Sequence, residues 1–173
     1  MKAWTLFTKL LPYLIVAYLI LNWAPIAWRN YNEQGKLSPQ FSVQLLEGTT
    51  LNSAEVEGPM VVVFWATWCG PCTLELMRIQ RLVRNGEIPR DSVLAISQEK
   101  DLELIRATVK ERGYSFPIGW DSTGELFHRF AINVTPTLVV LDSEKTIAWT
   151  TSGLSPTLEL RLRSHLKVPH KRN

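Results

Sequence analysis

The chain contains two cysteines, Cys69 and Cys72, within the run Trp-Cys-Gly-Pro-Cys. Cysteines at this spacing suit thiol–disulfide exchange, in which one thiolate attacks a disulfide and the second thiol resolves the mixed disulfide. Cys69 precedes a predicted helix, whose unpaired N–H groups favour the thiolate, and Cys72 lies one turn inside. Pro71 fits the first helical turn because its missing N–H would have no partner there. We therefore predict a redox dithiol with Cys69 as the attacking residue.

Two ordinary buried cysteines, or half of a zinc site, are the other interpretations of this pair. Zinc would need a second pair of ligands. The histidines His128, His165 and His170 are far apart in the sequence and lack ligand spacing. We therefore expect neither a metal nor a cofactor at the dithiol.

Hydrophobic patterning predicts the elements that position the cysteines. An apolar run over 60–65 predicts a buried strand that leads into the pair, and the pattern over 71–84 predicts the following helix. The remaining expected elements are a hairpin over 41–51, a strand over 92–97, a helix over 101–112 closed by Gly113, an extended segment over 116–118, a helical turn over 124–129, strands over 137–141 and 146–150, and a last helix that begins at Ser155-Pro156 with Ser as its cap. Strands that alternate with helices predict a three-layer α/β domain.

The N-terminal region differs in composition from the rest. Residues 10–28 carry no charge, and this length is close to the ~20 residues that cross a bilayer. Aromatic residues flank the run: Trp4, Phe7, Trp23, Trp28 and Tyr31. A cleaved signal peptide is the alternative, but residues 24–27 lack the small-x-small spacing of a cleavage site. We predict an uncleaved transmembrane anchor over 10–29.

Charge gives the expected orientation and excludes one class of partner. The positive charges on the two sides of the anchor are nearly balanced, but a short N-terminal tail usually stays inside, so the globular part is expected outside the cytoplasm. This would place the dithiol in an oxidising compartment. The net charge of +3 is too small and too evenly spread for nucleic-acid binding. The basic C-terminal end, with Lys167, His170, Lys171 and Arg172, is predicted to be a solvated tail.

Two motifs carry a resemblance to a known superfamily. The run Phe64–Cys72 resembles the active-site signature of thioredoxins, and Val134-Thr135-Pro136-Thr137 resembles their second landmark, a cis-proline that opens a strand. The anchor, the N-terminal hairpin and the helix at 101–112 resemble the membrane-tethered TlpA/ResA-like branch. Residues 134–140 and 151–153 resemble its suppressor-of-copper-sensitivity D-type (ScsD-like) members. The resemblance implies a thioredoxin fold, with a mixed sheet between helices.

The implied organisation has five segments. They are a short cytoplasmic N-terminus (1–9), a transmembrane anchor (10–29), a polar linker (30–38), a thioredoxin-like domain (39–168) and a tail (169–173). The thioredoxin-like domain would face the periplasm or the cell exterior from a bacterial cytoplasmic membrane.

The resemblance also implies roles for further residues. Pro136 would be the cis-proline packed against the disulfide, and Thr135 would offer its backbone to an extended client peptide. From the sequence alone, an ordinary trans turn is the alternative at Thr135-Pro136. Glu75 matches an acidic residue that could accept the proton of Cys72, although a solvated helix residue is equally compatible with the sequence. Trp68, Gly70 and Pro71 would line the client-binding surface beside Cys69, whereas Trp65 is expected in the core.

The chain departs from the family pattern at two positions. Val63 stands where cytosolic thioredoxins carry a buried Asp, so proton transfer by that Asp is excluded and Glu75 gains importance. Met77 stands where many TlpA/ResA-like proteins have Pro, which puts the usual kink of the active-site helix in doubt.

The Gly-Pro dipeptide resembles that of reducing thioredoxins, with potentials near about −270 mV, against roughly −120 mV for the oxidant DsbA. We therefore expect a disulfide reductase. Its implied clients are oxidised apocytochrome c or another thioredoxin-like protein, and its implied electron donor is a membrane protein of the DsbD or ScsB kind. An oxidase or isomerase with the same site is one alternative.

Two further alternatives, a thiol peroxidase and a copper-binding module, would require different sequence motifs. A thiol peroxidase would need Pro and Thr where Val62 and Ala66 stand. An anchored copper-binding module would use a Cys pair spaced by three residues with a distal His, although two thiolates can also bind Cu(I) adventitiously.

Overall fold

The computed structural model describes residues 2–166, without the side chains at 2–9, 19, 22, 23 and 26, so the predicted tail at 169–173 and its basic cluster lie outside the described residues. In chain order the elements are α1 (Lys2–Glu33), β1 (Ser42–Leu45), β2 (Thr50–Asn52), β3 (Met60–Phe64), α2 (Gly70–Arg84), the 3₁₀ helix η1 (Arg90–Ser92), β4 (Val93–Ser97), α3 (Leu102–Arg112), β5 (Ile118–Trp120), α4 (Glu125–Arg129), β6 (Thr137–Leu141), β7 (Ile147–Ser152) and α5 (Leu158–His165).

The strands form one mixed sheet in the order β2-β1-β5-β4-β3-β6-β7. The three central strands β5, β4 and β3 are parallel, because helical crossovers connect β3 to β4 and β4 to β5. The hairpin strands β1 and β2 extend the sheet at one edge, and β6 and β7 extend it antiparallel at the other. This is the thioredoxin-like α/β fold, and the predicted N-terminal hairpin and the helix after the second central strand are confirmed.

The centre of the sheet is buried on both faces, which explains its continuous apolar strands. Along β3, Val61 and Val63 face one core together with α2, α3 and α5. Met60, Val62 and Phe64 face the other core, together with α4 and the hairpin. The aromatic residues Phe64 and Phe127 pack edge to face there, with ring centroids 5.1 Å apart. The position of Val63 in the core confirms that no ionisable side chain stands beneath the dithiol on β3.

The helices α2 and α3 begin and end where the sequence predicts, within one residue. Asp101 caps α3 by accepting a hydrogen bond from the N–H of Leu104, and Gly113 ends it in the left-handed conformation. On α2, the buried positions are Cys72, Glu75, Leu76, Ile79 and Leu82. This spacing is one face of an α-helix, and it fixes α2 on the sheet with its N-terminus at the carboxyl end of β3.

The start of α5 differs from the prediction. Its first helical residue is Leu158, and Thr157 precedes it without a side-chain cap. Ser155 was expected to cap the helix, but its backbone N–H donates to Glu75 and the next residues form a turn. A contact with α2 therefore overrides the local Ser-Pro start signal.

The segment 30–38 is not a free linker. α1 continues to Glu33, and Leu37 then pairs with Thr146 at the edge of the sheet. Backbone hydrogen bonds join Gly35 to Ile147 and Ser38 to Lys145. This part of the chain therefore pairs with the start of β7 and the turn before it.

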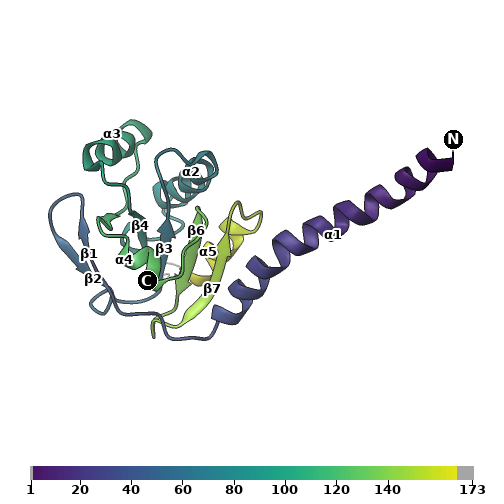
Figure 1. The fold of residues 1–173 in the computed structure, drawn as a ribbon. Helices are drawn as coiled ribbons and strands as arrows, with labels where there is room; N and C mark the ends of the chain where they lie inside the picture. The colour runs from purple at the N-terminus through teal and green to yellow at the C-terminus, as the bar shows by residue number, and fades with distance from the viewer. Residues whose placement is uncertain (1, 167–173) are drawn as a thin grey trace.

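α1 is a single helix that extends away from the domain (Figure 1). It continues through Pro12 and Pro25. Across the residues that the structure describes, no helix has the length and apolar character required to span a membrane.

Candidate functional site

Cys69 and Cys72 are joined by a disulfide at the N-terminus of α2. Cys69 occupies the cap position, where its sulfur accepts a hydrogen bond of 3.2 Å from the N–H of Cys72. Gly70 and Pro71 form the exposed start of the helix. Cys69 is 5% exposed and Cys72 is fully buried. Cys69 is therefore the sulfur that another molecule can approach.

The loop before β6 lies against the disulfide. The peptide bond between Thr135 and Pro136 is cis, as the resemblance implies. The carbonyl oxygen of Thr135 lies 3.6 Å from Sγ of Cys69, so that a thiol at Cys69 could donate to it after reduction. The same loop is fixed by the N–H of Gly153, which donates to the carbonyl of Pro136 at 2.7 Å. The two predicted landmarks of the sequence thus meet at one place.

A groove of about 490 Å³ runs between these two loops. Its walls include Trp68 from the cysteine loop and Thr135 from the loop before β6, and Glu99 lies at its side. Trp68 is 77% exposed, which is unusual for such a large apolar side chain. The groove therefore presents both the apolar surface of Trp68 and the backbone of Thr135 next to Cys69. Trp65 also borders the groove, but it is fully buried in the core.

Two charged residues fix the cysteine loop from other elements. The carboxylate of Glu99, after β4, accepts hydrogen bonds from the backbone N–H of Thr67 at 2.7 Å and from its hydroxyl at 2.6 Å. The guanidinium of Arg112, on α3, donates to the hydroxyl of Thr73 at 2.6 Å and to the carbonyl of Thr67 at 3.4 Å. Neither residue was predicted from the sequence, because no local motif marks them.

Glu75 lies one helical turn after Cys72 and is fully buried. Its carboxylate accepts hydrogen bonds from the N–H of Ser155 and, at 3.0 Å, from the guanidinium of Arg78. Burial raises the pKa of Glu75 above its ordinary value of 4.5, and outweighs the opposing effects of Ser155 and Arg78. The sequence left two interpretations of Glu75 open, and the one that made it a solvated helix residue is therefore wrong.

Arg78 extends this contact into a small charged network between α2 and α5. It also donates to the carbonyl of Ser155 at 2.8 Å and pairs with Glu159 at 3.3 Å. Glu159 has a further ion pair with Arg81. The side chains of Arg78 and Glu159 are partly exposed, so the network connects the fully buried carboxylate of Glu75 to the surface. Met77 is also exposed.

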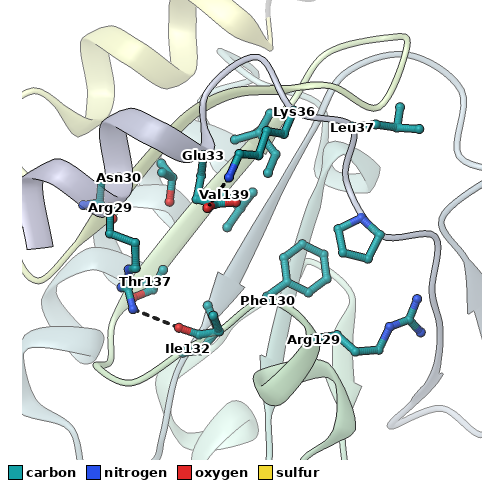
Figure 2. A pocket seen from close by; sticks show the side chains of 14 residues that line it. Arg29, Asn30, Glu33, Lys36, Leu37, Arg129, Phe130, Ile132, Thr137 and Val139 are labelled. Carbon is teal, nitrogen blue, oxygen red and sulfur yellow. Dashed lines mark hydrogen bonds and ion pairs between the residues drawn. The ribbon is translucent and has the colours of Figure 1, made fainter.

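A separate cavity of about 180 Å³ lies between the end of α1, the segment after it and the first residues of β6 (Figure 2). Its lining combines the cations Arg29, Lys36 and Arg129 with apolar residues such as Phe130 and Ile132. None of the predicted site residues lines it. Among the described residues, no group of three or more His, Cys, Asp or Glu side chains is arranged to hold a metal.

A thioredoxin-like sheet, a disulfide at a helix N-terminus and a cis-proline loop against the accessible sulfur define a thiol–disulfide oxidoreductase. The chain belongs to the AhpC/TSA family, which matches residues 34–150. The sporulation thiol-disulfide oxidoreductase A of Bacillus subtilis is 27% identical over 150 residues, or 84% of this chain and 90% of the relative. The ResA thiol-disulfide oxidoreductase of Bacillus cereus is 27% identical over 113 residues, or 65% of each chain.

The solved structures agree with this class. The crystal structure of StoA from Bacillus subtilis aligns with a TM-score of 0.62 at 25% identity, over 74% of this chain and 98% of that chain. The predicted resemblance to ResA-like oxidoreductases is thus confirmed, and dithiol–disulfide exchange through a Cys-x-x-Cys pair is the activity that fold, site and relatives share.

Proposed function

We propose that this protein is a membrane-anchored disulfide reductant that acts outside the cytoplasm. The observation that supports this direction is the surroundings of the sulfur of Cys69. In the described part of the chain, its only hydrogen-bond donor is the N–H of Cys72, and the carbonyl of Thr135 faces it at 3.6 Å. No Arg, Lys or His side chain donates to it there. A strongly oxidising dithiol needs a strongly stabilised thiolate, and one N–H opposed by a carbonyl gives little stabilisation.

In the proposed reaction, the thiolate of Cys69 attacks a disulfide sulfur of the client. A mixed disulfide forms, and the first client sulfur leaves as a thiolate that takes up a proton from water. The thiol of Cys72 then loses its proton and attacks the sulfur of Cys69. The bond between Cys69 and the client breaks, the disulfide Cys69–Cys72 forms, and the client receives two electrons as a dithiol.

We propose that the carboxylate of Glu75, one turn away on the same face of α2, accepts the proton that Cys72 loses. A raised pKa suits an acceptor that must take up a proton near neutral pH. In the oxidised structure the carboxylate is bonded to Ser155 and Arg78. Transfer from Cys72 therefore requires Glu75 to turn, or one water molecule to connect the two groups.

Client binding is assigned to the groove beside Cys69. The apolar face of Trp68 and the exposed start of α2 at Gly70 and Pro71 would contact side chains around the client disulfide. The backbone of Thr135, held in place by Pro136, would pair with the extended client chain. Proposed clients are oxidised apocytochrome c or another thioredoxin-like protein.

A reductant in an oxidising compartment must be reduced again after every turnover. We therefore propose a membrane electron donor of the DsbD or ScsB kind, which would deliver a dithiol to the same groove. No cofactor is needed, because both half-reactions are thiol–disulfide exchanges.

The membrane anchor is proposed for residues 10–29 of α1. A helix of 32 residues is about 48 Å long, which exceeds the ~30 Å hydrocarbon core of a bilayer. Consecutive apolar positions Leu14, Ile15 and Val16 are all exposed, so apolar side chains point to several sides of the helix. The proposal also depends on the sequence at 19, 22, 23 and 26, whose side chains lie outside the described residues.

The redox state of the full-length protein in intact cells tests the direction of exchange. Acid quenching followed by thiol alkylation should find Cys69 and Cys72 mostly reduced, and loss of the membrane donor should leave them oxidised. A mostly oxidised pair in cells with an active donor would instead support an oxidase or isomerase. Recovery of the protein in the carbonate-washed membrane fraction, with its domain accessible to protease from outside, tests the anchor and its orientation.

A further inference from the structure

The end of α1 is tied to the loop that carries the cis-proline. Arg29 reaches from α1 across the edge of the cavity to the backbone beside Ile132 (Figure 2). One guanidinium nitrogen of Arg29 donates to the carbonyl of Ala131 at 2.9 Å, and the other lies 3.4 Å from the hydroxyl of Ser152. Arg29 is 102 residues before Ala131, so this is a long-range contact.

Ala131 is the point at which the chain turns from α4 into this loop. Its φ of 51° lies in the left-handed region, which a residue with a Cβ adopts at some energetic cost. The bond from Arg29 to its carbonyl therefore helps to hold a backbone conformation that alanine does not favour by itself. Through this bond, α1 fixes the first residue of the loop over 131–136.

A second connection runs through two hydroxyl groups. The hydroxyl of Thr137 donates to the carbonyl of Val134 at 2.7 Å and lies 2.9 Å from the hydroxyl of Ser152. Each hydroxyl has a single proton, and that of Thr137 is used by Val134. Ser152 therefore donates to Thr137 and accepts from Arg29, which makes a continuous chain of donors from α1 to the loop.

Both connections end beside the reactive sulfur. Thr135 lies between Val134 and Pro136 in this loop, and its carbonyl faces Sγ of Cys69 at 3.6 Å. Glu33, one turn after Arg29, is paired with Lys36 at 2.8 Å. The guanidinium of Arg29 is therefore directed to the loop.

We propose that Arg29 is a positioning residue for thiol–disulfide exchange, which couples the N-terminal helix to the loop that contacts Cys69. By holding Ala131 and Ser152, it sets where the Thr135 carbonyl stands relative to the sulfur and whether the loop backbone is ready to pair with a client. The inference rests on the exchange activity of the site, not on its direction.

The test compares Arg29→Gln with Lys36→Gln in the full-length protein in detergent micelles. Lys36 lines the same cavity and carries the same charge, but its side chain bonds to Glu33 and not to the loop. Two readouts are used: the rate at which iodoacetamide alkylates Cys69 in the reduced protein as a function of pH, and the kinetics of reduction of insulin and of oxidised glutathione.

In Arg29→Gln, the Thr135 carbonyl is free to move away from the sulfur of Cys69. The thiolate should therefore form at lower pH, and the pH of half-maximal alkylation should fall. The KM for insulin should rise roughly three- to tenfold, because a loosened loop must be ordered on binding. Oxidised glutathione, which offers little extended backbone, should change less. Lys36→Gln should match the wild type in every readout.

Ser152→Ala provides a second variant that leaves the bond from Arg29 to Ala131 intact. It should shift the same readouts in the same direction by a smaller amount, and it carries the test if Arg29→Gln does not fold. Folded Arg29→Gln protein with unchanged alkylation and insulin kinetics would overturn the proposal, as would an equal shift in Lys36→Gln. A wild type that reduces neither substrate would instead contradict the reductase assignment. The alkylation profiles would still test whether Arg29 positions the loop beside Cys69.

Discussion

The buried carboxylate of Glu75 accepts a hydrogen bond from the backbone N–H of Ser155, 80 residues further along the chain. This contact joins the active-site helix α2, one turn after Cys72, to the segment that leads into α5. It places an ionisable group in the core, where burial raises its pKa. The same group therefore contributes to the pH dependence of stability and, in the proposed mechanism, to the resolving step.

Glu75→Gln should change how stability depends on pH. The folded-state pKa of Glu75 is raised above 4.5, so the folded protein binds more protons than the unfolded chain between these values. The free energy of unfolding of the oxidised wild type should therefore fall as pH rises from about 4.5 through the folded-state pKa, by about 1.4 kcal/mol for each pKa unit of the difference. The Gln variant should lack this loss, as measured by urea denaturation at several pH values.

Glu87→Gln is a matched control with the opposite sign. The hydrogen bond from Arg163 lowers the pKa of Glu87 below 4.5, so its stabilising effect is present above pH 4.5 and is lost as pH falls through the lowered pKa. Replacing Glu87 should therefore remove a pH dependence of the free energy of unfolding only below pH 4.5. A wild type and a Glu75→Gln variant with parallel stability profiles above pH 4.5 would show that the Glu75 carboxyl is not perturbed by burial.

The two cysteines should behave differently when each is replaced. Cys69→Ser should abolish turnover, because the accessible sulfur that attacks the client is removed. Cys72→Ser should retain the attack but lose resolution, so that a mixed disulfide accumulates and can be isolated by non-reducing electrophoresis after acid quenching. If Cys69→Ser rather than Cys72→Ser collected the mixed disulfide, the order of attack would be reversed.

Glu99→Gln should loosen the cysteine loop while keeping the size of the side chain. The carboxylate accepts from both the N–H and the hydroxyl of Thr67, and an amide can offer only one oxygen to these donors. The free energy of unfolding should fall by about 1–3 kcal/mol, and hydrogen exchange at the N–H of Thr67 should accelerate. Glu103→Gln, which breaks an exposed ion pair with Arg106, should change stability by less than about 1 kcal/mol. Equal losses in the two variants would contradict a specific role of Glu99.

The sequence predicted those parts of the fold that depend on local pattern. The central strands are continuous apolar runs because the sheet is covered on both faces, and α3 carries its own start and stop signals in Asp101 and Gly113. The predicted start of α5 was wrong for a physical reason. Its Ser-Pro signal is local, whereas the bond of Ser155 to Glu75 comes from a distant helix.

The same distinction applies to the site. The redox pair and the Thr135-Pro136 peptide stand in short motifs, which can be recognised within a few residues. The groups that hold those motifs in place come from far along the chain: Glu99 is 32 residues from Thr67, Arg112 is 45 residues from it, and Arg29 is 102 residues from Ala131. In the sequence, a charged residue of this kind cannot be told from one at the surface. Its distant partner is identified only when the folded topology brings the two residues together.

Gly119 offers a direct test of how the N-terminal hairpin is seated on the sheet. It lies on β5 between β1 and β4, where it pairs with Leu45 on one side and Ile96 on the other. A Cβ at this position would lie 2.9 Å from one methyl of Val43 and 3.3 Å from Cγ1 of Ile96. Gly119→Ala should therefore reduce the free energy of unfolding by about 1–3 kcal/mol through overpacking.

Val43→Ala removes the methyl groups that the new Cβ would meet. The double variant Gly119→Ala/Val43→Ala should therefore lose less stability than the sum of the two single variants, and a double-mutant cycle by urea denaturation measures the difference. Gly70→Ala is the control, because its Cβ would meet open space and its φ is not in the left-handed region. It should leave stability unchanged or raise it by up to about 1 kcal/mol. Strict additivity in the cycle would mean that Val43 does not pack against Gly119, and that the hairpin is seated differently on the sheet.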